Sequence, residues 1–478
     1  MAFRRVALPL CALFSSFAAC GGDDTTPAAS SLDGGPGDVP PGPDGGPQTT
    51  FPKGEGDPCR GEPLGDDAFV ADGLCVRLVA NEKVSHLRQI TFAPNGDILG
   101  ALSSGRIVLM HDADGDGRFS ASEITTWGEA GGDTNNAFID VAGNYVYAGS
   151  PTGVKRFAWD PAAPQGGPAE DVVVNQPGGG HAMRTAKVYD GFLYVDSGSS
   201  GNQSHDDQVK GEYDGKRSLI KRFDLSKLVA GTPFDWNKDG ENVSLGLRNP
   251  NGFARNETTG KIYAVVNGLD NQSYKGADVH QDNPGEQVAE VAAGKNYGYP
   301  FCFTAQRVVV GGALDAPAGT QLMAGFVNQP DRDDAWCAAN SQKPTTFVQA
   351  HAAPLDITFF DKQPSGALPE RWRGGAFIAL HGSWNRDAST GHKVVWQPFH
   401  PDGSSPMPAS TKDETTWPHE VVFGGAEGGK PKDGRWQWRT DANADSPRPS
   451  GVAVSPIDGA LYVATDSPGA LYRVGLTR

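Results

Sequence analysis

The feature that most constrains the fold is a phrase that recurs six times after residue 80. It consists of an apolar strand, a turn with Asn or Asp and Gly, and a second apolar strand, which is the pattern of a β-hairpin. Most copies are followed by a further apolar stretch suited to a third strand, such as GRIVLMHD or HKVVWQPF. The copies begin at Ile90 (ITFAPNGDILGAL), Phe138, Thr185, Gly252, Pro354 and Gly451.

Six units of about four strands each predict a six-bladed β-propeller, an all-β fold in which radial repetition leaves only short sheet edges. The first copies are roughly 48 residues apart and later spacings approach 100 residues, which predicts long loop insertions in blades three to six. A two-sheet sandwich is the alternative, but it gives no reason for the phrase to recur six times. Long loops on a rigid scaffold commonly carry functional residues.

Residues 1–20 have the pattern of a lipoprotein signal peptide. Arg4 and Arg5 precede an apolar stretch at 6–17 that is too short to span a bilayer comfortably. The stretch ends in Phe-Ala-Ala-Cys, which resembles a bacterial lipobox in which Cys20 is lipidated and becomes the mature N-terminus. Ordinary secretion with cleavage nearby is the alternative. The sequence therefore predicts a lipid-anchored protein of the bacterial cell envelope (outer membrane or periplasm) or a secreted one.

Residues 21–57 are rich in Gly, Pro and Asp and have almost no apolar side chains, so they cannot bury enough surface to fold. We interpret them as a disordered linker, which leaves residues 58–478 for the propeller. The net charge is −16, and an acidic chain does not suit the phosphate backbone of nucleic acids. Membrane contact is expected through the lipid anchor only.

The cysteines divide by position. Cys11 lies in the signal peptide and Cys20 is the lipidation site, so four cysteines remain and three pairings are possible. An oxidising compartment permits disulfides. The pairings that close the shortest loops are Cys59–Cys75 and Cys302–Cys337.

Residues 112–123 (DADGDGRFSASE) have the spacing of a twelve-residue calcium loop, with Gly117 at the sharp turn. The preceding stretch reads as a strand and no helical period flanks the loop, so we predict a structural site between strands rather than a calcium sensor. A turn without a metal is the alternative, but three neighbouring carboxylates repel each other when no cation is bound. The predicted ligands are Asp112, Asp114, Asp116, the carbonyl oxygen of Arg118, and Glu123.

Histidines and basic residues fall in corresponding loops of the repeats. GGGHAMR contains His181, GLRNPNG contains Arg248 and Asn249, and ALHGSWNR contains His381 and Arg386. Loops in corresponding positions of the blades can converge on one face of a propeller, which predicts a shared site. Taken alone, each motif also has an ordinary structural interpretation as a turn or a satisfied histidine.

The motifs GLRNPNGFA, EQVAEVAAGKNYGYPFC, HAAPLDITFF, GGAFIALHGSWNR and PSGVAVSPIDGALYVATD resemble the glucose/sorbosone dehydrogenase family, over about residues 80–478. Members are PQQ-dependent soluble sugar dehydrogenases on a six-bladed propeller, including soluble aldose sugar dehydrogenases. The resemblance implies the cofactors PQQ and Ca2+ and oxidation of the C1 of an aldose or a sorbosone-like sugar aldehyde. Hydride would move to PQQ, and electrons would then pass to an external acceptor.

Motif matching implies that His181 is the base that takes the proton from the anomeric hydroxyl, and that Arg248 steadies the reduced quinone oxygen. The carbonyl oxygens of Gly268 and Leu269 would ligate the cofactor calcium. The sequence departs from the family pattern at Gly180, where an Asp often precedes the base, and after Arg448, where a second Arg is often found. The cofactor-binding residues that the resemblance implies are Arg248, Asn249, Gly268, Leu269, His381, Arg386 and Arg448.

Two other function classes remain open at this point. A non-catalytic propeller lipoprotein that binds glycans or a partner would explain the missing second Arg. A calcium-dependent lactonase-type hydrolase would need a carboxylate-rich central calcium site, whereas the loops that the sequence offers are richer in His and Arg.

Overall fold

The computed structural model describes residues 69–131, 139–163, 165–182, 184–203, 216–326, 330–387, 389–412, 415–424, 448–467 and 469–477. The predicted signal peptide, the predicted linker and Cys59 lie outside these residues. Within them, no helix is both long enough and apolar enough to cross a membrane.

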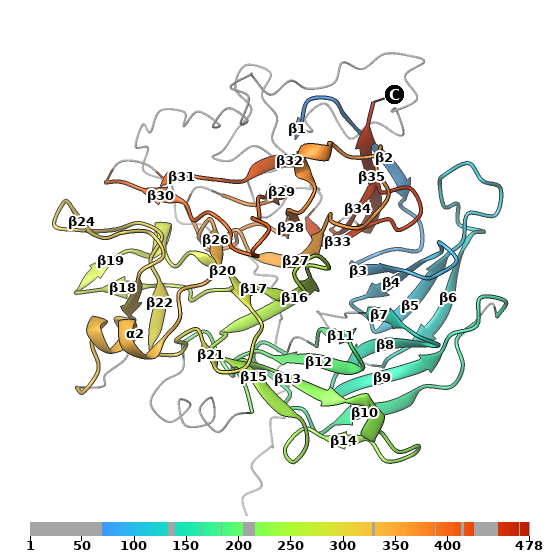
Figure 1. The fold of residues 1–478 in the computed structure, drawn as a ribbon, viewed down its shortest axis with the longest axis horizontal. Coiled ribbons are helices and arrows are strands. Elements are labelled where there is room, and N and C mark those ends of the chain that lie inside the picture. Colours follow the sequence, from blue (N-terminus) through green and yellow to red (C-terminus); the bar gives the residue numbers. More distant parts are fainter. Residues whose placement is uncertain are drawn as a thin grey trace, which may run out of the picture. The chain divides into compact units, whose positions relative to one another are not determined.

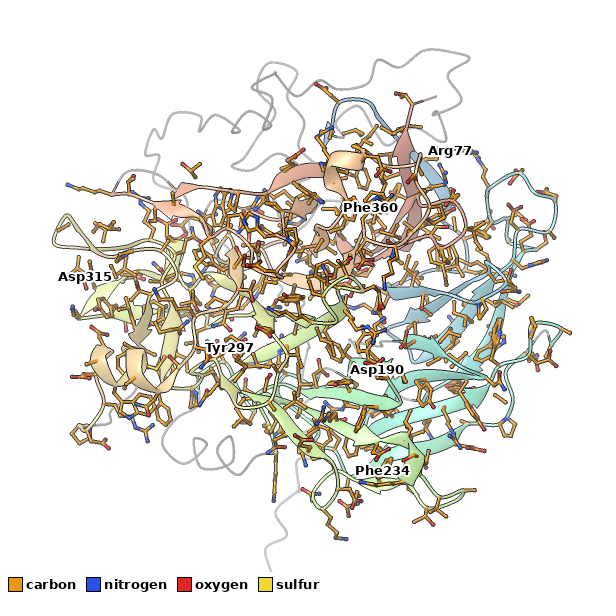
Figure 2. All side chains as sticks on the ribbon, in the orientation of Figure 1. Arg77, Asp190, Phe234, Tyr297, Asp315 and Phe360 are labelled. Carbon is orange, nitrogen blue, oxygen red and sulfur yellow. A yellow bond between two sulfur atoms is a disulfide. The ribbon has the colours of Figure 1, made fainter. Side chains whose placement is uncertain are left out.

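Six sheets of four or five strands stand around a common centre (Figure 1), which confirms the predicted six-bladed propeller. In every blade, the repeated phrase forms the two innermost strands and the apolar stretch that follows it forms the third. Because neighbouring blades cover both faces of each sheet, a second strand such as β28 is buried along its whole length. Side chains fill the spaces between the blades (Figure 2).

The blades are numbered in chain order, and their strands are given from the centre outward. Blade 1 comprises β3 (Leu87–Phe92), β4 (Ile98–Leu102), β5 (Arg106–Met110) and β6 (Ile124–Glu129). Blade 2 comprises β7 (Ile139–Ala142), β8 (Tyr145–Ser150), β9 (Gly153–Ala158) and β10 (Glu170–Val174). Blade 3 comprises β11 (Ala186–Tyr189), β12 (Phe192–Ser197), β13 (Leu219–Asp224) and β15 (Glu241–Leu245).

The remaining blades follow the same order. Blade 4 comprises β16 (Asn249–Arg255), β17 (Ile262–Asn267), β20 (Glu286–Glu290) and β26 (Thr346–Val348). Blade 5 comprises β27 (Pro354–Phe359), β28 (Ala376–Leu380), β29 (Lys393–Gln397) and β32 (Glu420–Gly424). Blade 6 comprises β33 (Pro449–Val454), β34 (Leu461–Asp466), β35 (Gly469–Leu476) and β2 (Leu74–Ala80). Short edge strands extend three blades: β14 (Phe234–Asp235) in blade 2, β21 (Lys295–Asn296) in blade 3 and β1 (Phe69–Val70) in blade 5.

The ring is closed by strands from the two ends of the described chain. The outermost strand of blade 6 is β2, which pairs antiparallel with β35 and places Leu74 opposite Leu476. Six backbone pairs along this seam join the early strand to the last one. The repeated phrase does not indicate this closure, because β2 precedes its first copy.

At five of the six interfaces between blades, a polar side chain on the inner strand forms a hydrogen bond with the backbone of the neighbouring inner strand. The interface between blades 4 and 5 has close packing in place of such a bond: a Cβ on Gly252 would lie 2.1 Å from Asp356 Oδ1, so only glycine fits there. The five bonds are Ile139 N to Gln89 Oε1 (2.7 Å), Val188 N to Asp140 Oδ2 (2.9 Å), Tyr189 Oη to the Phe253 carbonyl (3.4 Å), Val452 N to Asp356 Oδ2 (3.0 Å) and Ser450 Oγ to the Leu87 carbonyl (2.7 Å).

A long insertion between β17 and β26 confirms the expected loop expansion in blade 4. Cys302 and Cys337 form a disulfide that joins β22 to α2, as predicted. The second predicted bridge, between Cys59 and the buried Cys75, stays a prediction because Cys59 is not described. The insertion contains β18 (Ser273–Tyr274), β19 (Ala277–Asp278), η2 (His280–Asp282), β22 (Cys302–Thr304), β23 (Val308–Val310), β24 (Ala313–Ala316), β25 (Gln321–Met323) and α2 (Asp334–Asn340).

The strand order gives the propeller two distinct faces. The loops that enter each inner strand and leave each second strand emerge on what we call the upper face. The hairpin tips between the inner and second strands, and the loops between the third and fourth strands, lie on the lower face. The calcium loop at 112–123 connects β5 to β6, the third and fourth strands of blade 1, and therefore belongs to the lower face.

The geometry of the calcium loop suits a cation. One carboxylate oxygen each from Asp112, Asp114 and Asp116 lie within 4.8 Å of one another. Backbone N–H groups orient these side chains: Gly117 N donates to Asp112 Oδ2 at 3.0 Å, for example. Strands flank the loop on both sides, which confirms that it is not held between two helices. Glu123 accepts hydrogen bonds from Ala113 N and Ser120 N instead of joining the aspartates, so its role as a metal ligand stays a prediction.

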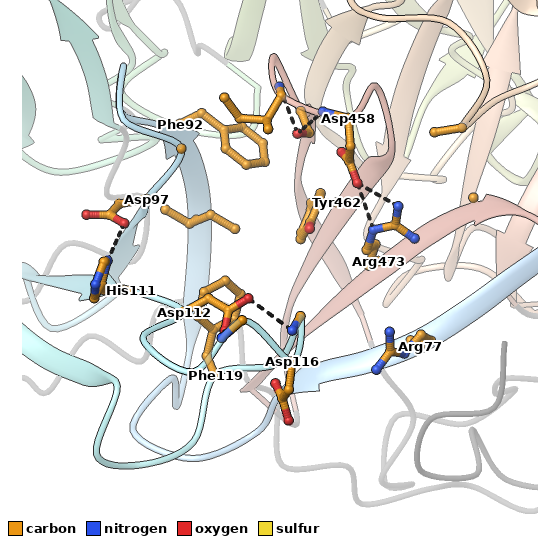
Figure 3. Close-up of a pocket in the computed structure, with 18 of the residues that line it drawn as sticks. Arg77, Phe92, Asp97, His111, Asp112, Asp116, Phe119, Asp458, Tyr462 and Arg473 are labelled. Atoms are coloured by element: carbon orange, nitrogen blue, oxygen red, sulfur yellow. Dashed lines mark hydrogen bonds and ion pairs between the residues drawn. The ribbon is translucent and has the colours of Figure 1, made fainter. Parts of the chain in front are cut away.

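The loop borders a cavity of about 600 Å³ between blades 1 and 6 (Figure 3). Phe92 and Tyr462 form an edge-to-face pair in its wall, and Phe119 from the calcium loop lies nearby. The cavity opens among hairpin tips of the lower face. It is therefore separate from the loops that carry the predicted catalytic histidine.

We expect calcium to stabilise the cofactor-free protein through this loop, because binding to the folded state alone adds about 2.7 kcal/mol at a hundredfold excess over Kd. Calorimetric titration should lose one calcium equivalent in the Asp114→Asn/Asp116→Asn variant, and EDTA should lower the melting temperature of the parent protein but not of this variant. Asp171→Asn, on an exposed ion pair of blade 2, is the matched control. An unchanged calcium stoichiometry in the double variant would refute the site.

Candidate functional site

The upper face gathers the residues that the sequence singled out from four different blades. His181 precedes β11, Arg248 precedes β16, which begins at Asn249, and Gly268 and Leu269 follow β17. His381 and Arg386 follow β28, and Arg448 precedes β33. This confirms the prediction that loops in corresponding positions of the blades lie on one face of the propeller. The structure divides these residues into two hydrogen-bonded groups, the Arg248 group and the Asp466 group.

His181 is held by the loop that leaves β12. Its Nδ1 lies 2.8 Å from the hydroxyl oxygen of Ser199, and its backbone N–H donates to the Ser199 carbonyl at 2.9 Å. Ser199 N in turn donates to the Arg248 carbonyl at 2.7 Å, which joins blade 3 to blade 4. A Cβ on Gly198 would lie 2.7 Å from the His181 Cβ, so the backbone passes close to the histidine.

Arg248 is the buried cation of the first group. Its Nη2 donates to Asn202 Oδ1 at 2.6 Å and forms an ion pair with Asp270 Oδ2 at 3.2 Å. Its Nε donates to the Asn202 carbonyl at 3.1 Å. Because a buried guanidinium needs an anionic partner and satisfied N–H groups, this network fixes both the charge and the orientation of Arg248.

Asp270 connects Arg248 to His351, which enters the inner strand of blade 5. His351 Nδ1 lies 3.5 Å from Asp270 Oδ1, and its Nε2 lies 2.7 Å from the His280 carbonyl. His351 has a φ of +64°, a left-handed backbone that points to a constrained position. The Glu286 carboxylate accepts hydrogen bonds from the backbone N–H groups of His351 (3.0 Å) and Gly268.

The electrostatics of this group favour a neutral His181. Burial and the Arg248 charge lower the pKa of His181 to about 3. Burial would raise the pKa of Asp270, but the hydrogen bond with His351 and the Arg248 charge bring it below the ordinary value. Burial raises the pKa of Glu286 to about 7. A neutral imidazole therefore lies beside a fixed positive charge and an ionised carboxylate.

The second group joins blades 5, 6 and 1. His381 Nε2 lies 3.0 Å from both oxygens of Asp466, and Arg88 forms an ion pair with the same carboxylate. Arg448 donates to the carbonyls of His381 (3.2 Å) and Gly382 (2.8 Å). Burial opposes ionisation of Asp466, but His381 and Arg88 lower its pKa. His381 is thus bonded to a carboxylate of its neighbour blade, and a direct contact with a cofactor stays a prediction.

The loop after β28 reaches towards the blade 4 insertion. Arg386 Nη2 lies 3.3 Å from Asp282 Oδ1, and Arg307 binds the other oxygen of that carboxylate at 3.2 Å. Trp384, two residues earlier, is 69% exposed. In the structure Arg386 forms an ion pair with Asp282, and its role in cofactor binding stays a prediction.

A ligand that offers a hydrogen-bond donor fits a buried acceptor that this face leaves available. The Oδ1 atom of Asn249 is buried and has no hydrogen-bond partner among the described residues, although it lies next to Gly198 and His181. Such an atom calls for a ligand or water to satisfy it. Gly268 also packs closely, since a Cβ there would lie 2.4 Å from Pro284 Cγ, and its N–H is bound to Glu286.

Ser199, Asp270 and Asp466 are the residues that sequence reasoning missed. Ser199 and Asp270 follow the second strand of a repeat, as His381 does, and Asp466 is the last residue of such a strand, so VDSGS, VVNGLD, ALH and VATD lie at the same end of their strands. Alignment of the repeats could have identified these positions. Arg88 was missed because it lies within the first repeat's inner strand, where nothing distinguishes it from a solvent-facing residue.

Comparison with known proteins supports the resemblance drawn from the motifs. A pyrroloquinoline quinone-dependent pyranose dehydrogenase of Coprinopsis cinerea is 28% identical over 404 residues, which are 80% of this chain and 51% of that protein. A pyrroloquinoline quinone-dependent sugar dehydrogenase of Hypocrea jecorina is 28% identical over 347 residues, 70% of this chain and 72% of that protein. The chain thus spans about half the length of the Coprinopsis relative.

Solved structures agree. The holo form of the pyranose dehydrogenase PQQ domain from Coprinopsis cinerea has a TM-score of 0.70 at 25% identity, covering 85% of this chain and 97% of that one. A calcium structure of family AA12 from Trichoderma reesei has a TM-score of 0.69 at 25% identity, covering 86% and 97%. The TrAA12-like family model matches residues 68–477, nearly the whole propeller. The chain belongs to the TrAA12-like family.

Proposed function

We propose that this protein is a quinoprotein dehydrogenase that oxidises the C1 of a sugar by hydride transfer to PQQ. The observation that carries the proposal is a half-buried, neutral His181 held beside Arg248 on the face where loops of several blades meet. Its relatives are named pyranose and sugar dehydrogenases, which supports an aldose or a sugar aldehyde as substrate. Within this substrate class, the motifs imply a sorbosone-like sugar aldehyde.

The residues present suit PQQ and Ca2+. Arg248 and Arg448 would bind its oxygens and carboxylates. The unsatisfied Oδ1 atom of Asn249 can only accept, so it would take a hydrogen bond from the ring N–H of the cofactor or from a bridging water. The carbonyl oxygens of Gly268 and Leu269 would hold the calcium, an oxygen-seeking cation. When bound, PQQ supplies a two-electron acceptor, and calcium supplies Lewis-acid polarisation.

The chain's own residues would prepare the proton transfer. His181 is uncharged and can accept the proton of the anomeric hydroxyl. Arg248, fixed by Asn202 and Asp270, presents a positive charge where negative charge develops in the transition state. His351 holds Asp270 from the opposite side, so the orientation of Arg248 depends on blades 3, 4 and 5 together.

The cellular setting is also proposed. The Arg4–Arg5 start, the short apolar stretch and Cys20 support a lipid anchor in the bacterial envelope. Substrate would then be oxidised outside the cytoplasm, and an external acceptor would take the electrons.

The first test is binding of PQQ to the full-length protein in detergent with and without Ca2+, followed by dye reduction with a panel of aldoses. We expect turnover to require both cofactors. His181→Ala should retain PQQ binding and lose roughly 10²–10⁴-fold in kcat, the usual contribution of a general base.

Lys155→Ala, which removes an exposed ion pair on blade 2, should leave turnover unchanged and serves as the control. Stoichiometric PQQ binding without oxidation of any sugar would favour the binding-protein alternative. PQQ-dependent turnover that survives in His181→Ala would exclude His181 as the base.

The acid limb of the pH profile provides a second test. A general base works in its unprotonated form. Burial and the charges of Arg248 and Arg217 outweigh the opposing charge of Asp270 and lower the pKa of His181 to about 3. We expect kcat/KM of the holoenzyme to stay constant as pH falls from 7 to about 5, where an ordinary histidine of pKa about 6.5 would be mostly protonated. A midpoint near 6.5 would contradict this electrostatic description.

A further inference from the structure

A neutral imidazole can accept a proton only at the ring nitrogen that carries no hydrogen, so its tautomer decides which atom of His181 is the base. Ser199 is the side chain that contacts the ring, with its Oγ 2.8 Å from Nδ1. A serine hydroxyl can donate or accept, and the ring contact alone does not fix the direction of this hydrogen bond.

The second partner of Ser199 fixes the direction. Its Oγ lies 2.7 Å from the carbonyl oxygen of Gly201, which can only accept. The single hydroxyl proton must therefore lie towards Gly201, because otherwise two oxygens would face each other at 2.7 Å with no proton between them. Ser199 is fully buried, so bulk water does not offer an alternative partner. The lone pair of Oγ is then directed to a hydrogen on Nδ1.

The backbone holds Ser199 in this position. Its N–H donates to the Arg248 carbonyl at 2.7 Å, and its carbonyl accepts from His181 N at 2.9 Å. The Ser199 carbonyl also favours a protonated ring, although burial and the Arg248 charge dominate and lower the pKa of His181.

We propose that Ser199 is a positioning residue that holds His181 as the Nδ1–H tautomer and leaves the Nε2 lone pair for the substrate hydroxyl. The identity of the substrate rests on the proposed function, whereas the tautomer does not. In the proposed reaction the O–H bond of the anomeric hydroxyl would break and an Nε2–H bond would form on His181, while a bound quinone cofactor would supply the acceptor for the C1 hydride. The hydrogen bond from Nδ1 to Ser199 stays in place throughout.

A serine is a neutral partner, which distinguishes this arrangement from a histidine oriented by a carboxylate. A carboxylate would raise the basicity of the ring, whereas a hydroxyl orients it without adding charge. Charge near the ring comes instead from Arg248, Asp270 and Arg217.

The decisive measurement is long-range 1H–15N NMR of the histidine rings in the cofactor-free protein, with His181 assigned by comparison with His181→Gln. We expect the parent protein and Ser199→Thr to carry the proton on Nδ1, and Ser199→Ala to shift towards Nε2–H or a mixture. An Nε2–H ring in the parent protein, or an unchanged tautomer in Ser199→Ala, would overturn the proposal.

Kinetics provide a second readout. Ser199→Ala should lower kcat by about 10- to 100-fold, less than removal of the base, while KM and the Kd for PQQ stay within about twofold. Ser199→Thr should recover most of the rate. Ser455→Ala, at a buried serine on the lower face, controls for the general loss of a buried hydroxyl.

The two proposals fail in different ways. An Nδ1–H ring that responds to Ser199→Ala, together with no sugar oxidation by any form, would support the tautomer and refute the dehydrogenase. Sugar oxidation with an undiminished kcat in Ser199→Ala would support the dehydrogenase and refute the positioning role of Ser199.

Discussion

The inner strands of a propeller have one edge that no neighbouring strand covers, and the backbone groups along that edge require partners. Here side chains from the adjacent blade supply them, as when Asp356 accepts from Val452 and Gln89 accepts from Ile139. These bonds satisfy the backbone and also fix the distance between blades at the centre. On the upper face, one set of loops enters these inner strands and the other leaves the second strands paired with them, so the central bonds also fix the distances between the loops of the site.

The site is an arc of buried charges that crosses blade boundaries. Arg248 and His351 share Asp270, and His381 and Arg88 share Asp466. A buried charge is unfavourable unless a partner compensates it, and here each of the two carboxylates has a partner from another blade. The two groups are joined by His381 N, which donates to the Ala353 carbonyl two residues after His351. The arrangement therefore exists only when the blades are assembled, and it contributes to holding them together.

The sequence predicted the blades well because each hairpin is specified locally, by alternating apolar residues and a turn of Asn, Asp or Gly. The Cys302–Cys337 bridge is one of the pairings that the sequence favoured because they close the shortest loops. The site was predicted less completely. His181 and Arg248 could be named from their motifs, whereas Ser199 and Asp270 acquire meaning only through distances that the folded chain creates. Hydrogen-bond partners such as Asp466 for His381 depend on pairs about 85 residues apart in the chain.

The pairing of β2 with β35 also has a consequence for how the molecule comes into being. The early strand β2 must remain unpaired until β35 has been synthesised, so the ring cannot close before that point. Blades 1 to 5 can form from local contacts, whereas blade 6 must wait for strands that are nearly the whole chain apart. Because the arc of charges on the upper face includes Asp466 and Arg88, it too is completed only by this final event, and a half-made chain has no assembled site.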